Sequence, residues 1–234
     1  MDPLDRPIWH SLNGGWRAFA VGDACALRLR APVGVFGAAR DAEAPSIAAL
    51  GRLGEAAGGY WAIERRPMPV PRGHAAVREV AIEQMVLDRL ADDGSGSDAG
   101  IVPLGPSQGA AMVALARLTE PGPFNAETWR LGGFVGRFEG TRLVAMAGER
   151  MRVPGLTEVS AVCTHPDHRG QGHARALMAA VIRGILARGE GAFLHSYASN
   201  SSAIALYGSL GFRRRATMTV SVVAPLSHFA GEHI

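Results

Sequence analysis

Two glycines and an arginine stand directly before a helix-forming stretch of this sequence. In HPDHRGQGHARALM, residues 165–178, Arg169 precedes Gly170 and Gly172, and a run suited to a helix follows. Glycine lets the backbone approach a bulky group closely, and the first N–H groups of a helix have no partner within it. With the helix dipole and the arginine, this pattern favours a bound phosphate or pyrophosphate. Two glycines alone more often mark a tight turn that binds nothing.

Other phosphate-binding loops fit these residues less well. A dinucleotide-binding G-x-G-x-x-G loop needs a third glycine, and that glycine is missing. All 24 basic positions are arginine. The chain therefore has neither the lysine of a G-x-x-x-x-G-K-[ST] loop nor a Schiff-base lysine.

The neighbouring segments are expected to hold this loop between a strand and a helix. Residues 156–164, LTEVSAVCT, predict the strand, and the helix after the loop is expected to end at Gly189. A further strand, AFLHSYA, precedes a short helix that Asn200 caps. RRATMTVSVV, residues 214–223, predicts a half-buried final strand. One face of the short helix holds Ala203, Leu206, Tyr207 and Leu210.

The small, acidic stretch ADDGSGSDAG, residues 91–100, is the best candidate for a domain boundary. We therefore expect an N-terminal α/β half over residues 1–97 and a second domain over residues 98–234. The first half predicts a helix at 45–59 and strands at 60–66 and 74–87. The second predicts two strands around a Glu139-Gly140 turn, and a helix that Ser107 caps and that carries Met112, Leu115 and Leu118.

Composition describes an ordinary soluble globular chain. Its 234 residues are 47% hydrophobic, and the mean hydropathy is +0.08. No apolar run is long enough to span a bilayer, and MDPLDRPIWH lacks the features of a signal peptide. The two cysteines form neither a disulfide framework nor a metal pattern. We expect a cytoplasmic protein without membrane contact.

The net charge of +3 is unevenly spread. Residues 1–100 hold 11 Arg against 13 Asp and Glu, whereas residues 101–234 hold 13 Arg against 8. A basic second half suits an anionic ligand. The charge is too small to argue for nucleic acid, and no nucleic-acid-binding motif is present, so no such partner is expected.

Two ordered motifs resemble the GNAT superfamily of acyl-CoA-dependent N-acetyltransferases. Arg169 to Ala174, RGQGHA, fits the family's R/Q-x-x-G-x-G/A loop, and the segment from Asn200 to Phe212 fits N-x-x-A-x-x-x-Y-x-x-x-G-F. The resemblance covers roughly residues 101–224 and is nearest to bacterial acetyltransferases with an extra N-terminal half. It implies an α/β (α+β) fold with a mixed, mainly antiparallel central sheet and flanking helices. Residues 1–97 share no motif with the family, and whether they are a degenerate relative of the same fold stays open.

The resemblance also implies a cosubstrate, acetyl-CoA, and a set of residues that bind it. The pyrophosphate loop would comprise Arg169, Gly170, Gln171, Gly172, His173 and Ala174. The backbone of Val162, Cys163 and Thr164 would pair with the pantetheine arm, and Asn200 and Ala203 would complete the site. An acceptor amine would attack the thioester directly, with no covalent enzyme intermediate.

Tyr207 matches the family's general acid, which protonates the departing thiolate. A tyrosine with the ordinary pKa of about 10 is protonated at neutral pH and can donate. The alternative is a packing residue. For Asn200, contact with the pantetheine amide and an ordinary helix cap are compatible.

Glu158 matches a carboxylate that deprotonates the amine in many family members, and it would need burial to act as a good base. An exposed strand glutamate is the alternative, and His195 is a second candidate base. His165, His168 and His173 resemble metal ligands, but nothing supports them, so surface histidines and no metal are expected. For Cys163, a small buried residue is favoured over a nucleophile.

The sequence therefore favours an N-acetyltransferase acting on an amine, either of a small molecule or of a protein N-terminus. A non-catalytic acyl-CoA-binding regulatory module is the alternative. Neither the acceptor nor the oligomeric state follows from the residues.

Overall fold

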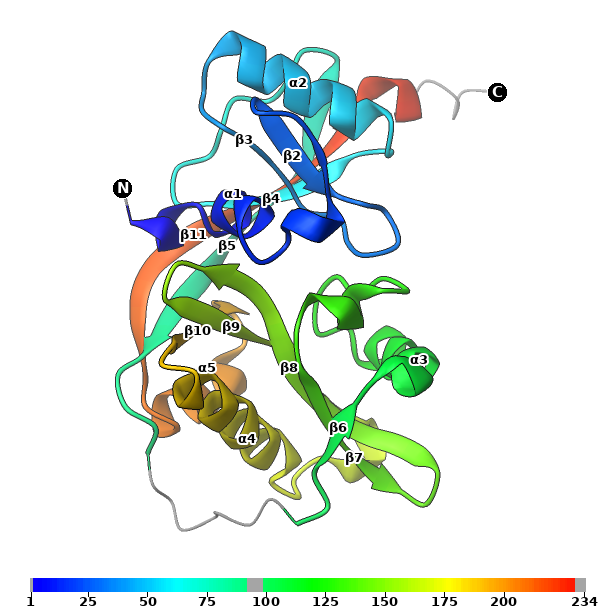
Figure 1. Ribbon diagram of the computed structural model, residues 1–234, viewed down its shortest axis with the longest axis vertical. Helices are drawn as coiled ribbons and strands as arrows, with labels where there is room; N and C mark the ends of the chain where they lie inside the picture. Colours follow the sequence, from blue (N-terminus) through cyan, green and yellow to red (C-terminus); the bar gives the residue numbers. More distant parts are fainter. Residues whose placement is uncertain (1, 92–98, 230–234) are drawn as a thin grey trace. The chain divides into compact units, whose positions relative to one another are not determined.

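The computed structural model describes residues 2–91 and 99–229 (Figure 1), and the chain divides into two compact units. Unit 1 holds the described residues of Met1–Ile82, Met151–Pro154 and Ala216–Ile234, and unit 2 those of Glu83–Arg150 and Gly155–Arg215. The predicted boundary between residues 97 and 98 lies outside the described residues. The two units divide at other points, and neither is one continuous stretch of chain.

Unit 1 is built from short strands and helices. Its helices are α1 (Pro7–Asn13) and α2 (Ala44–Glu55), and its strands are β1 (Ala20–Gly22), β2 (Ala26–Leu29), β3 (Gly37–Ala39) and β4 (Tyr60–Glu64). β1, β2 and β3 form an antiparallel sheet, and α2 packs on it through Ile47 and Leu50. β4 pairs antiparallel with β11 (Phe212–Pro225), where Tyr60 faces Val223. This pairing brings the C-terminal residues into unit 1.

The longer elements predicted for the first half are confirmed. The helix at 45–59 is α2, and the strands at 60–66 and 74–87 are β4 and β5 (His74–Leu87). The sequence did not indicate α1 or the strands β1 to β3. These elements are too short to show a periodic pattern of apolar residues.

Unit 2 is organised around a mostly antiparallel sheet. Hydrogen-bonded neighbours follow the order β11-β5-β10-β9-β8-β7-β6. β6 and β7 pair antiparallel, as do β7 and β8, whereas β9 and β10 pair in parallel. The remaining bounds are β6 (Val102–Leu104), β7 (Phe134–Glu139), β8 (Arg142–Val153), β9 (Leu156–Thr164), β10 (Gly191–Tyr197), α3 (Gly109–Thr119), α4 (His173–Ala187) and α5 (Ser201–Ser209). The expected mixed α/β fold is confirmed.

Helices α3 and α4 cover opposite faces of this sheet, on either side of β8 in Figure 1. Met146 of β8 packs with Met112 and Leu115 of α3, whereas its neighbours Ala145 and Ala147 pack with α4. Successive strand residues point to opposite faces of the sheet, so alternate residues of β8 pack in the core under α3 and in the core under α4. The small alanines let α4 lie close to the sheet.

Several second-half predictions are confirmed and two are wrong. The strands around Glu139-Gly140 are β7 and β8, and α4 ends just before Gly189, which is left-handed. Ser107 does not cap α3, because it lies in a separate 3-10 turn and α3 begins at Gly109. Leu118 is 53% exposed rather than part of the core.

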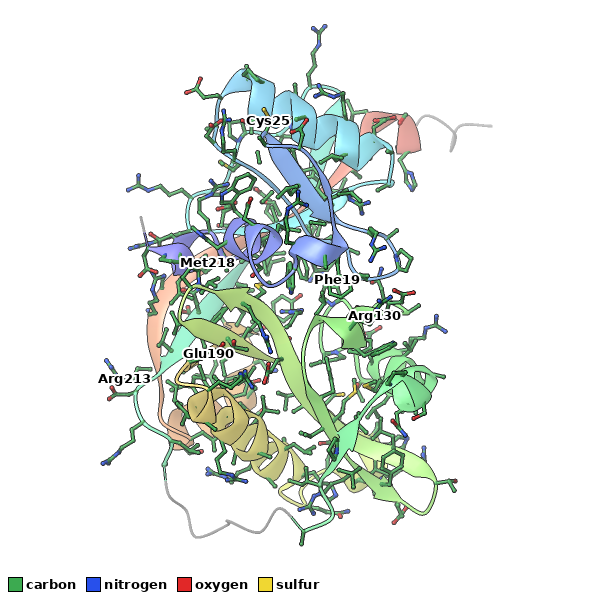
Figure 2. All side chains as sticks on the ribbon, in the orientation of Figure 1. Phe19, Cys25, Arg130, Glu190, Arg213 and Met218 are labelled. Atoms are coloured by element: carbon green, nitrogen blue, oxygen red, sulfur yellow. The ribbon has the colours of Figure 1, made fainter. Side chains whose placement is uncertain are left out.

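The basic run at the start of β11 is bound to the neighbouring strand β5 and to Asp88, which directly follows that strand. Arg213 pairs with Asp88 at 2.9 Å, Arg214 pairs with Glu83, and Arg215 donates to the Gln84 side chain at 2.7 Å. Figure 2 shows Arg213 projecting away from the ribbon. Part of the positive charge of the second half is therefore compensated locally. Within the described residues, no helix is long and apolar enough to cross a membrane.

Candidate active site

The glycine loop forms an open cradle of backbone N–H groups at the start of α4. Gly170 and Gly172 have φ angles of 77° and 76°, and Gly172 is the N-cap of the helix. A Cβ atom at either position would meet nothing within 4 Å. In the described part of the chain, the N–H groups of Gly170–Ala174 have no hydrogen-bond acceptor. Exposed Arg169 beside them has no ion pair there. An anion would satisfy both the N–H groups and the positive end of the helix dipole.

Strand β9 separates from β10 just before this loop. The parallel register matches Leu156–Glu158 with Gly191–Phe193, and β9 continues to Thr164. Ala161 has a φ of 51°, an uncommon conformation for a residue with a side chain. Val159 packs in the core under α4, whereas Cys163, four residues on, packs in the core under α3. In a regular strand these two residues would share a face, so Ala161 marks a β-bulge that inserts one residue.

The bulge and the separation leave a strand edge suited to a ligand. A bulge interrupts the ladder and leaves backbone groups unpaired. Val162 and Thr164, predicted to face pantetheine, are half-buried, and Cys163 is buried. An extended amide-bearing ligand can add to such an edge through main-chain hydrogen bonds.

Asn200 caps α5, as the sequence predicted. Its Oδ1 accepts hydrogen bonds from the Ala203 N–H and the Ser202 hydroxyl, both at 3.2 Å. Its Nδ2 group has no acceptor among the residues that the structure describes. The helix cap thus occupies the Oδ1 atom of Asn200, and its Nδ2 group can donate to a ligand.

Tyr207 of α5 combines packing with an unpartnered hydroxyl. Its ring lies 6.4 Å from that of Phe212 and packs against the core under α4. Burial raises the pKa of Tyr207, so the hydroxyl stays protonated throughout the neutral range. Over the described residues, this hydroxyl has no hydrogen-bond partner. The packing interpretation is correct for the ring, and the hydroxyl can still act as a proton donor.

Glu158 lies in a buried ion pair. Its carboxylate is 1% exposed, so the alternative of an exposed strand glutamate is wrong. Arg150 of β8 binds both oxygens, at 2.9 and 3.0 Å, and His195 Nδ1 lies 2.8 Å from Oε1. Burial alone would raise the pKa of Glu158, but Arg150 and His195 outweigh it and lower the pKa to about 2. The burial that a base requires is present, but the pKa shifts in the direction that weakens a base.

Two side chains contact the ring nitrogens of His195. Arg215 donates to Gln84 Oε1 at 2.7 Å, so the Gln84 NH₂ group faces His195 Nε2, 3.0 Å away. Because a carboxylate can only accept, Nδ1–H donates to Glu158. Both ring nitrogens of His195 are therefore engaged. His195 links β10 to Glu158 where the backbone pairing of β9 and β10 ends.

The other nucleophilic and metal-like residues have ordinary surroundings. Cys163 is buried, as predicted, and burial raises the pKa of its thiol to about 11, which makes it a poor nucleophile. His165 is buried and contacts Arg142, so the expectation of a surface histidine is wrong there. His168 pairs with Glu139 at 2.9 Å. Among the described residues, no group of three or more ligating side chains could hold a metal ion.

Sequence reasoning missed three residues of this region: Ala161, Arg150 and Gln84. Nothing in an alanine indicates a left-handed bulge. A signal was available for Arg150, since it and Glu158 are opposite charges flanking the tight turn between β8 and β9. Gln84 comes from β5, and only the sheet order brings it to His195.

The bulged strand, the loop with unpaired N–H groups after it and the mixed α/β sheet that carries both agree with the arrangement expected from the resemblance to GNAT acyltransferases. A sequence model of FR47-like proteins matches residues 134–221. A GNAT-family protein from Novosphingobium aromaticivorans, described as an acetyltransferase, is 44% identical with a TM-score of 0.88, over 96% of this chain and 99% of that chain. The chain belongs to the GNAT family of acetyltransferases.

More distant solved structures share the fold over nearly the whole chain. A GCN5-related N-acetyltransferase from Kribbella flavida is 21% identical with a TM-score of 0.64, over 95% of this chain and 96% of that chain. A GCN5-related N-acetyltransferase-like protein from Streptococcus suis is 16% identical with a TM-score of 0.55, over 94% and 92%. No curated protein matches the chain.

Proposed function

We propose that the chain transfers an acetyl group from acetyl-CoA to an amine by direct attack within a ternary complex. The observation that carries this proposal is the row of N–H groups at Gly170–Ala174, which have no acceptor among the described residues and follow an open strand edge. The row suits the pyrophosphate, and the edge of β9 from Val162 to Thr164 suits the amides of pantetheine.

The acetyl thioester would lie beside the bulge at Ala161. A backbone N–H released there from the ladder can polarise the thioester carbonyl and hold the developing oxyanion. The amine nitrogen attacks the carbonyl carbon, a C–N bond forms and the C–S bond breaks. Tyr207 donates its proton to the departing thiolate, since its hydroxyl is protonated and has no partner in the described chain.

The amine must also lose a proton, and Glu158 was the predicted acceptor. A carboxylate with a pKa of about 2 binds a proton poorly at neutral pH, and Arg150 and His195 already occupy it. We propose that the acceptor enters as the neutral amine and that Glu158 positions the strands. The rate at limiting acceptor would then rise with pH up to the amine's own pKa.

The acceptor is proposed to be the amine of a small molecule or of a protein N-terminus, with the reaction taking place in the cytoplasm. Neither nucleic acid nor a membrane is proposed as a partner. The test is thiol release from acetyl-CoA across a panel of amines, with acetylated product identified by mass. The proposal is supported if an amine increases the rate of thiol release and if this rate falls sharply in the Tyr207→Phe variant. CoA binding without release for any amine would instead indicate a non-catalytic acyl-CoA-binding module.

A further inference from the structure

Unit 1 contains an open cavity of about 940 Å³, and no function was predicted from the sequence for the residues that line it. Helix α1, the turn after β3 and the end of β4 line it. Small-molecule pockets typically have volumes of about 300–1,000 Å³, so the cavity is of ligand size. The residues used below are Arg6, Trp9, His10, Arg66 and Met68, all of which line it.

Most charges on the cavity wall are already paired. Arg6 binds both oxygens of Glu64, at 3.0 and 3.2 Å, and donates to the backbone carbonyls of Ala39 and Arg40. This pair is rigid and buried, with side-chain exposures of 12% and 3%. Arg6 is thus part of the wall rather than a free cation.

In the described chain, the arginines at the rim of the cavity are also in ion pairs, except Arg66. Arg65 pairs with Asp5 at 3.3 Å, and Arg40 pairs with Asp41 at 2.7 Å. Arg66 is exposed and has no ion pair within the described ranges. Each of the three lining carboxylates is matched by an arginine, so Arg66 is the one lining arginine without a matching carboxylate in the described chain. One guanidinium fits one carboxylate in a bidentate pair, whereas a phosphate dianion would call for further cations.

The rest of the wall suits a flat apolar group. Trp9 and Met68 are half-buried, and the Arg6 guanidinium carbon lies 5.8 Å from the Trp9 ring centroid. This cation–π contact holds the ring in place. His10 adds a second ring, and burial, aided by Arg6, lowers its pKa and favours the neutral imidazole.

We propose that this cavity binds an aromatic carboxylate, with the ring against Trp9 and Met68 and the carboxylate on Arg66. The inference goes beyond the acetyl-transfer proposal and does not depend on it, because no residue of the cavity belongs to the loop, to β9 or to α5.

The test is calorimetric titration of the full chain with 2-naphthoate, compared with the uncharged 2-naphthamide. The dissociation constant of naphthoate should be lower than that of the amide by a factor of about ten or more, the difference expected for a charged hydrogen bond. Arg66→Gln should remove that advantage. The matched control is Arg72→Gln, which changes an exposed, unpaired arginine of the described part of unit 1 outside this cavity and should leave the affinity unchanged. Trp9→Ala should weaken both probes.

Four outcomes would overturn the proposal. They are no binding of naphthoate at millimolar concentration, equal affinity for naphthoate and naphthamide, equal losses in the Arg66 and Arg72 variants, and displacement of naphthoate by saturating CoA. Each leaves the acetyl-transfer proposal untouched, since that rests on CoA binding and amine-dependent thiol release.

Discussion

Replacing Gly172 by aspartate should abolish CoA binding while leaving the protein folded. Gly172 has a φ of 76°, and a Cβ atom added there would meet nothing within 4 Å. The only cost to folding stability is therefore the strain of a non-glycine residue in a left-handed conformation, about 1–2 kcal/mol. The carboxylate also lies at the positive end of the dipole of α4, which offsets part of that cost.

The expected loss of affinity follows from the charge placed in the cradle. A carboxylate about 4 Å from a phosphate repels it by about 4 kcal/mol at an effective dielectric constant of about 20. At about 1.4 kcal/mol per factor of ten, the dissociation constant should rise by about 10³. Steric exclusion of the phosphate from the N–H groups adds to this value.

Gly189 offers a matched control at the other end of the same helix. Its φ is 75°, and a Cβ atom added there also meets nothing within 4 Å. Gly189→Asp introduces the same strain and the same charge, but at the negative end of the dipole. Thermal unfolding should rank Gly172→Asp as the more stable variant, and calorimetry should rank it as far the weaker CoA binder. Equal CoA affinities in the two folded variants would refute the assignment of the loop.

Four further predictions follow from the site and the fold. Tyr207→Phe should keep CoA affinity while kcat falls by about 10²–10⁴, and unchanged kcat would make Tyr207 a packing residue only. Because the pKa of Glu158 is lowered, its ionised form stabilises the fold above pH 4.5, by a free energy on the order of 3 kcal/mol that should disappear as the pH falls toward 2. In measurements of unfolding free energy against pH, Glu158→Gln should flatten this part of the curve. An unchanged curve would contradict the role of the ion pair. Activity should survive EDTA, whereas inactivation reversed by zinc would return the three histidines to consideration. A chain starting at residue 101 lacks β5, which lies between β11 and β10, so it should fail to fold; a folded, CoA-binding fragment of residues 101–234 would contradict this.

Local periodicity explains which parts of the fold could be predicted. The helix after the loop, the strand at residues 156–164 and the cap at Asn200 each depend on neighbours in sequence, and all three agree with the structure. The division into units could not be predicted in this way. It depends on β11 pairing with β4 across about 160 residues, and no local pattern encodes such a register.

The candidate site divides in the same way between local and long-range features. The two glycines are recognisable because their left-handed conformations exclude most other residues. The role of Glu158 was harder to infer, since a carboxylate on a strand can be a base or one half of an ion pair. Only Arg150 and His195, from two neighbouring strands, set the direction of its pKa shift.

Amide NMR during titration with CoA tests the central claim most directly. If the loop and the open strand edge bind CoA, the largest shift changes should fall on the N–H groups of Gly170–Ala174 and Val162–Thr164. The N–H of Gly189, at the far end of α4, should change little. CoA binding accompanied by changes elsewhere, with the amides of Gly170 and Gly172 unmoved, would contradict the proposed site.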